Sequence, residues 1–159
     1  MSSKALSRLV RTAVVAVGVC GLFGCFYVLP GEGRYMARIY PELARFFWPW
    51  LLFLWVAALP CFGLLGLVWQ VSSFIKREAV FTKEAAYFIK SGAVLLSYEA
   101  GFFLLGNIVF LVLGGSHPVV LLAALFIVVL ALALAVGAGA VSRYIARAAA
   151  LQEEADSTI

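Results

Sequence analysis

The chain has 159 residues, of which 65% are hydrophobic and 13% are charged, and its formal net charge is +4. Soluble domains are about 45–50% apolar and about 25% charged, so this composition excludes an ordinary soluble protein. The basic residues form no dense patch of the kind that binds nucleic acid directly. Apolar runs at about residues 12–29, 49–71, 91–114 and 119–141 are long enough to cross a bilayer. We therefore predict one all-α domain, an integral membrane four-helix bundle.

The first apolar run follows three basic residues, as the apolar part of a signal peptide would. A signal peptide has about 7–15 apolar residues and a small-residue cleavage site, whereas residues 12–29 are longer and end in bulky side chains. We interpret this run as the first spanning helix. Pro30, Gly31 and Gly33 are typical helix breakers, so we expect them to end it.

The segment from residue 30 to residue 46 is the longest predicted external loop. Its apolar side chains recur at helical spacing with charged residues between them, which predicts a short helix in the membrane interface, split by Pro41. The aromatic cluster that follows is typical of an interfacial belt rather than of a binding site; its members are Phe46, Phe47, Trp48 and Trp50.

The second span contains Pro60, which is expected to kink it. In the connection that follows, Thr82 and Glu84 are typical of a helix start. Threonine caps the free N–H groups of the first turn, and an acid is favoured near the positive end of the helix dipole. The third helix should therefore begin near Lys83, and residues 83–90 should form an amphipathic cytoplasmic extension.

Glu99 is the one carboxylate that falls deep inside an apolar run. It lies nine residues after the nearest preceding charge and fifteen before the end of its run, or about 14 Å and about 22 Å along a helix. A lone ionised carboxylate at that depth costs about 2–3 kcal/mol or more, so Glu99 should face protein rather than lipid. Gly92 and Gly106 share its helix face and would let a neighbouring helix approach closely, and Asn107 lies nearby.

Two interpretations of Glu99 and Asn107 stay open. The first is an intramembrane polar site for a proton, an ion or a ligand, since ionisable residues inside a membrane are functional candidates by default. The second is a neutral or hydrogen-bonded carboxyl that fastens one helix to another. The predicted spans hold no second charge that could pair with Glu99.

The fourth span follows a tight turn and is made almost wholly of Val, Leu, Ala and Ile. Ala133, Gly137 and Ala140 would form a small-residue packing face near its end. His117, in the turn, is the sole histidine and cannot build a metal site alone. The three cysteines all lie in apolar runs, so we predict no disulfide framework, no metal site and no other cofactor.

The membrane topology follows from the distribution of Lys and Arg. The amino terminus, the middle connection and the tail at 143–159 hold three, four and two of these residues, whereas the first loop holds three and the last turn none. Basic residues favour the cytoplasmic side, so we predict that both termini are cytoplasmic. The fourth helix should continue about two turns beyond the membrane. Its acidic end is then either frayed, or paired with basic residues of the middle connection or with a basic face of a partner.

Two short motifs resemble the YoaS-like family of bacterial four-span membrane proteins, which is catalogued as a domain of unknown function. The first is Phe81-Thr82-Lys83-Glu84, where the family typically reads Pro-Phe-Thr, any residue, Glu-Asn. The second is the ending LQEEADSTI, from Leu151 to Ile159, which is similar to the family's Leu-Gln-Glu-Glu-Asn-Asp-Leu-Thr-Ile. Alanine replaces the two asparagines in this chain, and the layout of spans agrees over nearly the whole length.

The resemblance implies a protein of the bacterial inner membrane that acts with a small cytoplasmic helix-turn-helix regulator. We accordingly predict a non-enzymatic regulatory or interaction protein. The docking residues would be Phe81, Thr82, Glu84, Leu151, Gln152, Glu153, Glu154 and Asp156. The alternative is a small oligomeric transporter or permeation unit that uses Glu99, with a second copy of the chain as a further partner besides the lipid bilayer. An enzyme is least favoured, because the chain has no Ser/His/Asp set and no paired carboxylates in one span.

Overall fold

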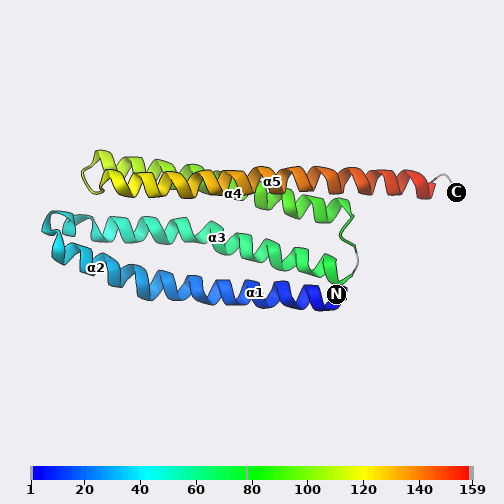
Figure 1. Ribbon diagram of the computed structural model, residues 1–159, viewed down its shortest axis with the longest axis horizontal. Helices are drawn as coiled ribbons and strands as arrows, with labels where there is room; N and C mark the ends of the chain where they lie inside the picture. The colour runs from blue at the N-terminus through cyan, green and yellow to red at the C-terminus, as the bar shows by residue number, and fades with distance from the viewer. Residues whose placement is uncertain (1, 78, 158–159) are drawn as a thin grey trace.

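A computed structural model describes residues 2–77 and 79–157, and over these residues the protein is all-helical (Figure 1). The elements in chain order are α1 (Ser3–Phe23), the π-helical turn η1 (Gly24–Val28), α2 (Leu29–Ile39), the 3-10 helix η2 (Pro41–Phe46), α3 (Phe47–Lys76), α4 (Lys83–Val112) and α5 (Pro118–Ser157). Together they make four helical segments that are long and apolar enough to cross a membrane. The predicted all-α, four-span architecture is confirmed.

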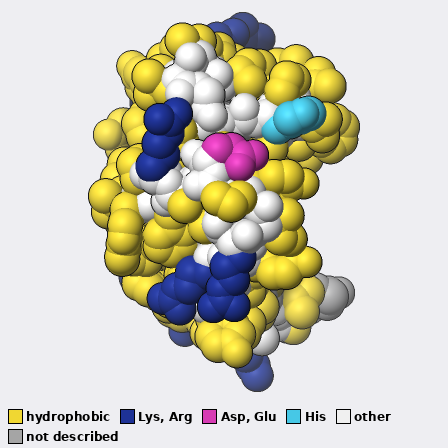
Figure 2. Space-filling model, turned by 90° about the vertical axis from the view of Figure 1, so that its left-hand side faces the viewer, with side chains coloured by type: hydrophobic (Ala, Val, Ile, Leu, Met, Phe, Trp, Pro, Cys, Tyr) yellow, Lys and Arg dark blue, Asp and Glu magenta, His cyan; other side chains and the backbone are white. Residues whose placement is uncertain are grey.

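The start of α1 and the end of α5 lie at the same end of the molecule, on the right in Figure 1. We call it the terminal end; the α2–α3 and α4–α5 connections form the opposite, turn end. Close backbone contacts join α1 to α3, α3 to α4, and α4 to α5, and none joins α1 to α5 in the described part of the chain. The four helices therefore pack in chain order and leave one side open. Seen from the turn end, the molecule is hollowed on one side (Figure 2).

The first segment is one continuous rod formed by α1, η1 and α2, so the prediction that Pro30, Gly31 and Gly33 end the first helix is wrong. Gly33 serves close packing instead, because the ring of Phe47 lies 2.9 Å from where its Cβ would be. Pro41 does break the helix, as predicted. The short helix expected in the first loop is thus the last part of α2 together with η2, and its location in the membrane interface stays a prediction.

The π turn explains how Pro30 fits inside the rod. The N–H of Leu29 bonds to the carbonyl of Gly24, five residues back, and Pro30 has no N–H to offer. The carbonyl of Cys25 therefore loses its partner within the helix, and an unpaired backbone group in hydrocarbon costs several kcal/mol. The indole Nε1 of Trp55, on α3, donates to this carbonyl at 2.9 Å. A side chain from the neighbouring helix thus replaces the hydrogen bond that the proline removes.

The start of α4 follows the sequence closely. The helix begins at Lys83, and the hydroxyl of Thr82 accepts a hydrogen bond from the N–H of Ala85 at 3.2 Å, as predicted for an N-cap. At its other end, Gly114 has a φ of +73°, which glycine adopts readily, and the N–H of Gly115 bonds to the carbonyl of Phe110 at 2.8 Å. This turn reverses the chain into α5.

The tightest helix pair is α4 with α5, and a seven-residue repeat of small side chains lies between them. The buried row on α4 is Ala86, Ala93, Ala100 and Asn107, and the row on α5 is Val128, Ala135, Ser142 and Ala149. The hydroxyl of Ser142 donates to the carbonyl of Ala86 at 2.7 Å and fixes the register. Small residues at a heptad spacing let two helix backbones run close together over a long distance.

This interface corrects the packing face predicted for the fourth span. Ala133, Gly137 and Ala140 are exposed, and no side chain packs against Gly137. The buried row that begins at Val128 lies on another face of α5. The position of α4 decides which face of α5 is buried, whatever the number of small residues on each face. The helix also continues to Ser157, beyond the two turns expected after the membrane, and projects past the other helices at the terminal end (Figure 1).

Aromatic side chains close the turn end. Trp50 stacks on Phe110 with ring centroids 4.6 Å apart, and its Nε1 donates to the carbonyl of Gly115 at 2.8 Å. The ring of Phe53 lies over Gly106, in the space that a Cβ would occupy. Part of the predicted interfacial belt therefore packs inward against α4 and its turn, whereas Trp48 is 62% exposed.

We predict that Trp55→Phe lowers the free energy of unfolding by about 1–3 kcal/mol, because the carbonyl of Cys25 then loses its donor. In the Pro30→Ala background, residue 30 regains an N–H, so the cost of Trp55→Phe should shrink. A double-mutant cycle measured by thermal unfolding in detergent checks this coupling. Equal costs in both backgrounds would show that the indole does not replace the missing donor.

We also predict that Gly106→Leu destabilises the protein by about 1–3 kcal/mol, since the new side chain must displace the packed ring of Phe53. Gly101→Leu is the matched control on the same helix, because nothing lies within 4 Å of that position, and its effect should stay within about 0.5 kcal/mol. Melting temperatures measured in the same detergent should be lower for Gly106→Leu than for Gly101→Leu. Similar melting temperatures would contradict close packing of Phe53 on Gly106.

Candidate functional site

Glu99 lies near the middle of α4 with 9% of its surface exposed. The predicted small-residue face around it packs toward α3, since Leu64 and Leu67 lie against Gly92, and Phe53 lies against Gly106. The side chain therefore faces protein, as expected from the cost of exposing a carboxylate to lipid.

No described residue forms a hydrogen bond or an ion pair with the Glu99 carboxyl. The nearest polar side chains along α4 bond within their own helix: Ser97 donates to the carbonyl of Ala93 at 2.9 Å and Asn107 to that of Phe103 at 2.8 Å. A carboxyl that fastened two helices would accept a bond from the facing helix. The geometry therefore leaves the hydrogen-bonding capacity of Glu99 available to something other than the described chain.

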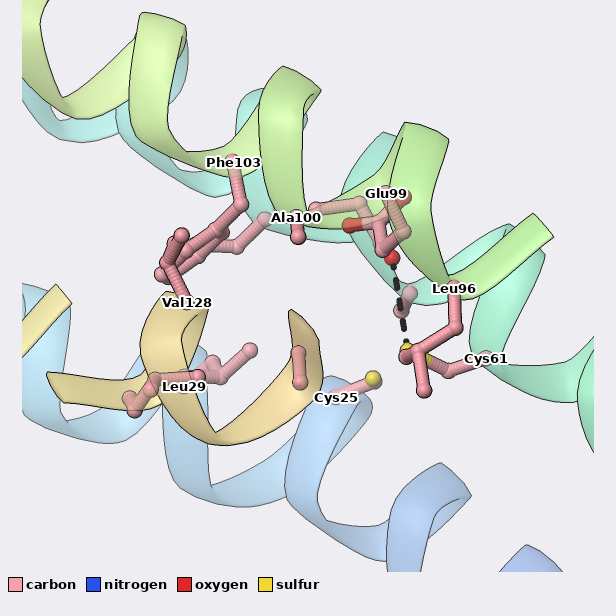
Figure 3. A pocket seen from close by; sticks show the side chains of 13 residues that line it. Cys25, Leu29, Cys61, Leu96, Glu99, Ala100, Phe103 and Val128 are labelled. Atoms are coloured by element: carbon pink, nitrogen blue, oxygen red, sulfur yellow. Dashed lines mark hydrogen bonds between the residues drawn. The ribbon is translucent and has the colours of Figure 1, made fainter. Parts of the chain in front are cut away.

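Glu99 lines a cavity of about 280 Å³ to which all four helical segments contribute (Figure 3). The first segment provides Cys25 and Leu29, and α3 provides Leu54, Ala57, Ala58 and Cys61. The other lining residues are Leu96, Glu99, Ala100 and Phe103 of α4 with Ile127, Val128 and Ala131 of α5. Glu99 is the one charged residue among them, and the thiols of Cys25 and Cys61 are the other polar groups.

The structure separates the two residues of the predicted intramembrane polar site. Asn107 is 1% exposed and belongs to the row of α4 that packs on α5, whereas Glu99 faces α3 and the cavity. Asn107 does not line the cavity. Its amide Nδ2 bonds to the carbonyl of Phe103, which relieves much of the cost of burying it.

Sequence reasoning did not connect the cysteines with Glu99. Cys25 reaches the cavity from the π turn, and Cys61 lies one residue after Pro60 on α3, where its Sγ contacts the carbonyl of Ala57 at 3.7 Å (Figure 3). A signal was available in Pro30, five residues after Cys25, because a proline inside a membrane helix disturbs the backbone before it. In the described residues, no group of His, Cys, Asp or Glu could hold a metal ion.

The predicted docking residues lie at the terminal end, around the start of α4 and the last turns of α5. Phe81 is 61% exposed and Leu151 is 67% exposed. Lys83 forms an ion pair with Glu153, which is the pairing expected if the tail contacts the middle connection. Thr82 is occupied as the cap of α4, and Glu84 is exposed in its first turn.

The rest of the tail is helical as well. Gln152 and Glu154 are exposed, and Glu154 takes part in a further interaction. The side chain of Asp156 lies outside the described residues, as do residues 158–159. The tail therefore continues α5 as an ordered helix through Ser157.

A polar cluster joins the first helix to the end of α3 at the same end of the molecule. The hydroxyl of Ser7 donates to the carbonyl of Ser72 at 2.8 Å, and the guanidinium of Arg11 donates to the hydroxyls of Ser72 and Ser73, each at 3.0 Å. The same guanidinium lies 4.9 Å from the ring centroid of Trp69. Arg11 is thus held by protein, and it fixes α1 against α3.

Comparison with known proteins identifies the family. Residues 31–159 match the family described as "Protein of unknown function (DUF2975)". Over 157 residues the chain is 26% identical to the "Uncharacterized membrane protein YoaS" of Bacillus subtilis (strain 168), a match that covers 94% of each protein. No solved structure matches significantly. The chain therefore belongs to the DUF2975 family and is a membrane protein with four candidate spans.

Proposed function

We propose that this protein is a non-enzymatic interaction protein of the bacterial inner membrane, and that the start of α4 and the end of α5 dock a cytoplasmic protein. The observation that carries the proposal is the projection of α5 beyond the other helices, with its last turns bound to the start of α4 by the Lys83–Glu153 ion pair (Figure 1). A projecting helix end with exposed apolar side chains beside it is typical of a protein-binding surface.

The cytoplasmic orientation is supported by charge. Nine of the twelve Lys and Arg residues belong to the segments that meet at the terminal end, and three belong to the loop at the turn end. This asymmetry favours a cytoplasmic terminal end. A docking protein would then approach the surface from the cytoplasm.

The proposed surface combines a rigid base with exposed anchors. Below it, Ala85, Ser142 and Ile145 are buried, and the Ser142 hydroxyl joins α5 to α4. Above it, Phe81 and Leu151 present apolar side chains that no described residue covers fully. An exposed ion pair contributes only about 0–1 kcal/mol to stability, so Lys83–Glu153 matters for the shape and charge of the surface more than for folding.

The partner that we propose is a small helix-turn-helix regulator, the class implied by the family resemblance. The membrane protein would hold this regulator at the membrane and so control its access to DNA. Direct contact between this chain and nucleic acid is not part of the proposal.

The second candidate function is transport or permeation with Glu99 as the polar site. One observation favours it: a buried carboxyl without a partner among the described residues lines a cavity reached by all four helical segments. An oligomer would cover the open side of the molecule in that case. Genes for transport encoded nearby would favour this candidate, and a helix-turn-helix gene nearby would favour the first.

Topology can be tested with reporters. A fluorescent protein fused after Ile159 should fold and fluoresce, because it would remain in the cytoplasm. A periplasmic enzyme inserted after Tyr40, at the break between α2 and η2, should be active. Activity of the same enzyme inserted near residue 80, together with loss of the fluorescent signal, would show that the predicted membrane orientation is reversed.

Deleting residues 151–159 is expected to leave the four spans inserted and folded, because Ser142 and Ala149 already join α5 to α4. It should abolish co-purification of the proposed helix-turn-helix regulator from detergent extracts. Retention of full binding by the truncated chain would contradict the docking proposal and would favour transport or permeation as the function.

Charge reversal tests the ion pair within the same assay. Lys83→Glu and Glu153→Lys should each weaken binding of the regulator, and the double variant should restore it if the pair only shapes the surface. Failure of the double variant to restore binding would instead indicate that one of the two charges contacts the regulator directly. Unchanged binding in both single variants would exclude this part of the surface.

A further inference from the structure

We propose that the cavity at Glu99 binds a small hydrophobic organic cation, of the quaternary phosphonium or ammonium class with apolar substituents. The proposal is independent of docking at the terminal end. It gives the second candidate function a ligand class, but binding does not require that the cation be transported.

The charge of the ligand follows from the lining of the cavity. Only 9% of the Glu99 surface is exposed, and its carboxyl receives no hydrogen bond from a described residue. None of the residues that line the cavity is basic. A bound cation would supply the missing counter-charge in a region where an unpaired carboxylate is costly. An anion of the same size would be repelled.

The chemical class follows from what the lining lacks. A small hard cation needs several oxygen ligands, and Glu99 provides the one side-chain carboxyl among the lining residues, which are otherwise apolar or thiol-bearing. A weakly hydrated organic cation, bulkier than a metal ion, needs only a single counter-charge and apolar contact. The ring of Phe103 is also part of the lining and can face such a cation.

The size and opening of the cavity fit an apolar ligand. Its volume of about 280 Å³ is close to the lower end of the range for small-molecule sites, about 300–1,000 Å³. A second cavity of about 330 Å³, with wholly apolar lining from α3, α4 and α5, shares Leu96 with the first. A ligand dissolved in the bilayer could enter from the open side, where α1 and α5 do not meet.

The probe pair that tests the charge is tetraphenylphosphonium and tetraphenylborate, which have nearly the same shape and opposite charge. Equilibrium dialysis of the full-length protein in a neutral detergent, with empty micelles as the baseline, measures binding of each. We expect saturable binding of the phosphonium at one site per chain and no saturable binding of the borate. Equal binding of the two ions, or no saturable binding of the phosphonium, would overturn the proposal.

The variants separate the role of the carboxyl from that of the cavity. Glu99→Gln should weaken phosphonium binding by about tenfold or more, whereas Glu32→Gln, an exposed carboxylate on α2, should bind as the natural protein does. If Glu99→Gln does not fold, Ala131→Phe decides, because it keeps the carboxyl and fills the cavity. Its matched control is Ala133→Phe, which adds the same ring on an exposed face of α5.

The chain contains its own reporters of position. Bound phosphonium should slow alkylation of Cys25 and Cys61 by N-ethylmaleimide, followed by mass spectrometry, and should leave the rate at Cys20, which does not line the cavity, unchanged. Full binding by Ala131→Phe, full binding by folded Glu99→Gln, or equal protection of all three thiols would each overturn the site. Loss of regulator docking with intact phosphonium binding would overturn only the docking function.

Discussion

The close contact between α4 and α5 is the interaction on which the rest of the structure depends. Two buried rows at a seven-residue spacing, mostly alanine, bring the helices together over most of their length, and the Ser142–Ala86 hydrogen bond fixes how far one helix is shifted along the other. In lipid, where burying apolar surface gains little, such close packing and interhelical hydrogen bonds are the main sources of helix association. This pair orients the Glu99 face of α4 toward α3, and it supports the projecting end of α5.

Backbone hydrogen bonding imposes the second constraint. In water a proline inside a helix leaves a carbonyl that solvent can satisfy, but in hydrocarbon that carbonyl must find a donor in the protein. The π turn before Pro30 leaves the carbonyl of Cys25 without a partner in its own helix, and the indole N–H of Trp55 on α3 donates to it. The same arrangement brings a thiol and a widened helical turn to the wall of the central cavity. A local defect of one helix thereby becomes part of the contact between two helices and of the candidate site.

The sequence predicted those features that depend on local chemistry. The cap at Thr82, the break at Pro41 and the four spans could be read from residue types alone, because each follows from nearby side chains or from the length of an apolar run. Features that depend on which helix faces which could not be read in this way. The continuation of the first helix through Pro30 depends on a donor on α3, 30 residues after the carbonyl that it satisfies. The burial of one face of α5 rather than another depends on the position of α4. The burial of Glu99 was expected on energetic grounds, but its separation from Asn107 and its proximity to two thiols depend on tertiary packing.

The arrangement of the helices in chain order has a consequence for biogenesis. Each spanning segment packs on the one made immediately before it, so no later helix has to be inserted between earlier ones. The pair formed by the first two segments can assemble in the bilayer as soon as α3 has left the ribosome, and the strongly associated α4–α5 hairpin can then join it as a preformed unit through α3 and α4. Such an order keeps the sequence separation of contacting helices small, which favours rapid assembly and limits the time during which Glu99 is exposed to lipid.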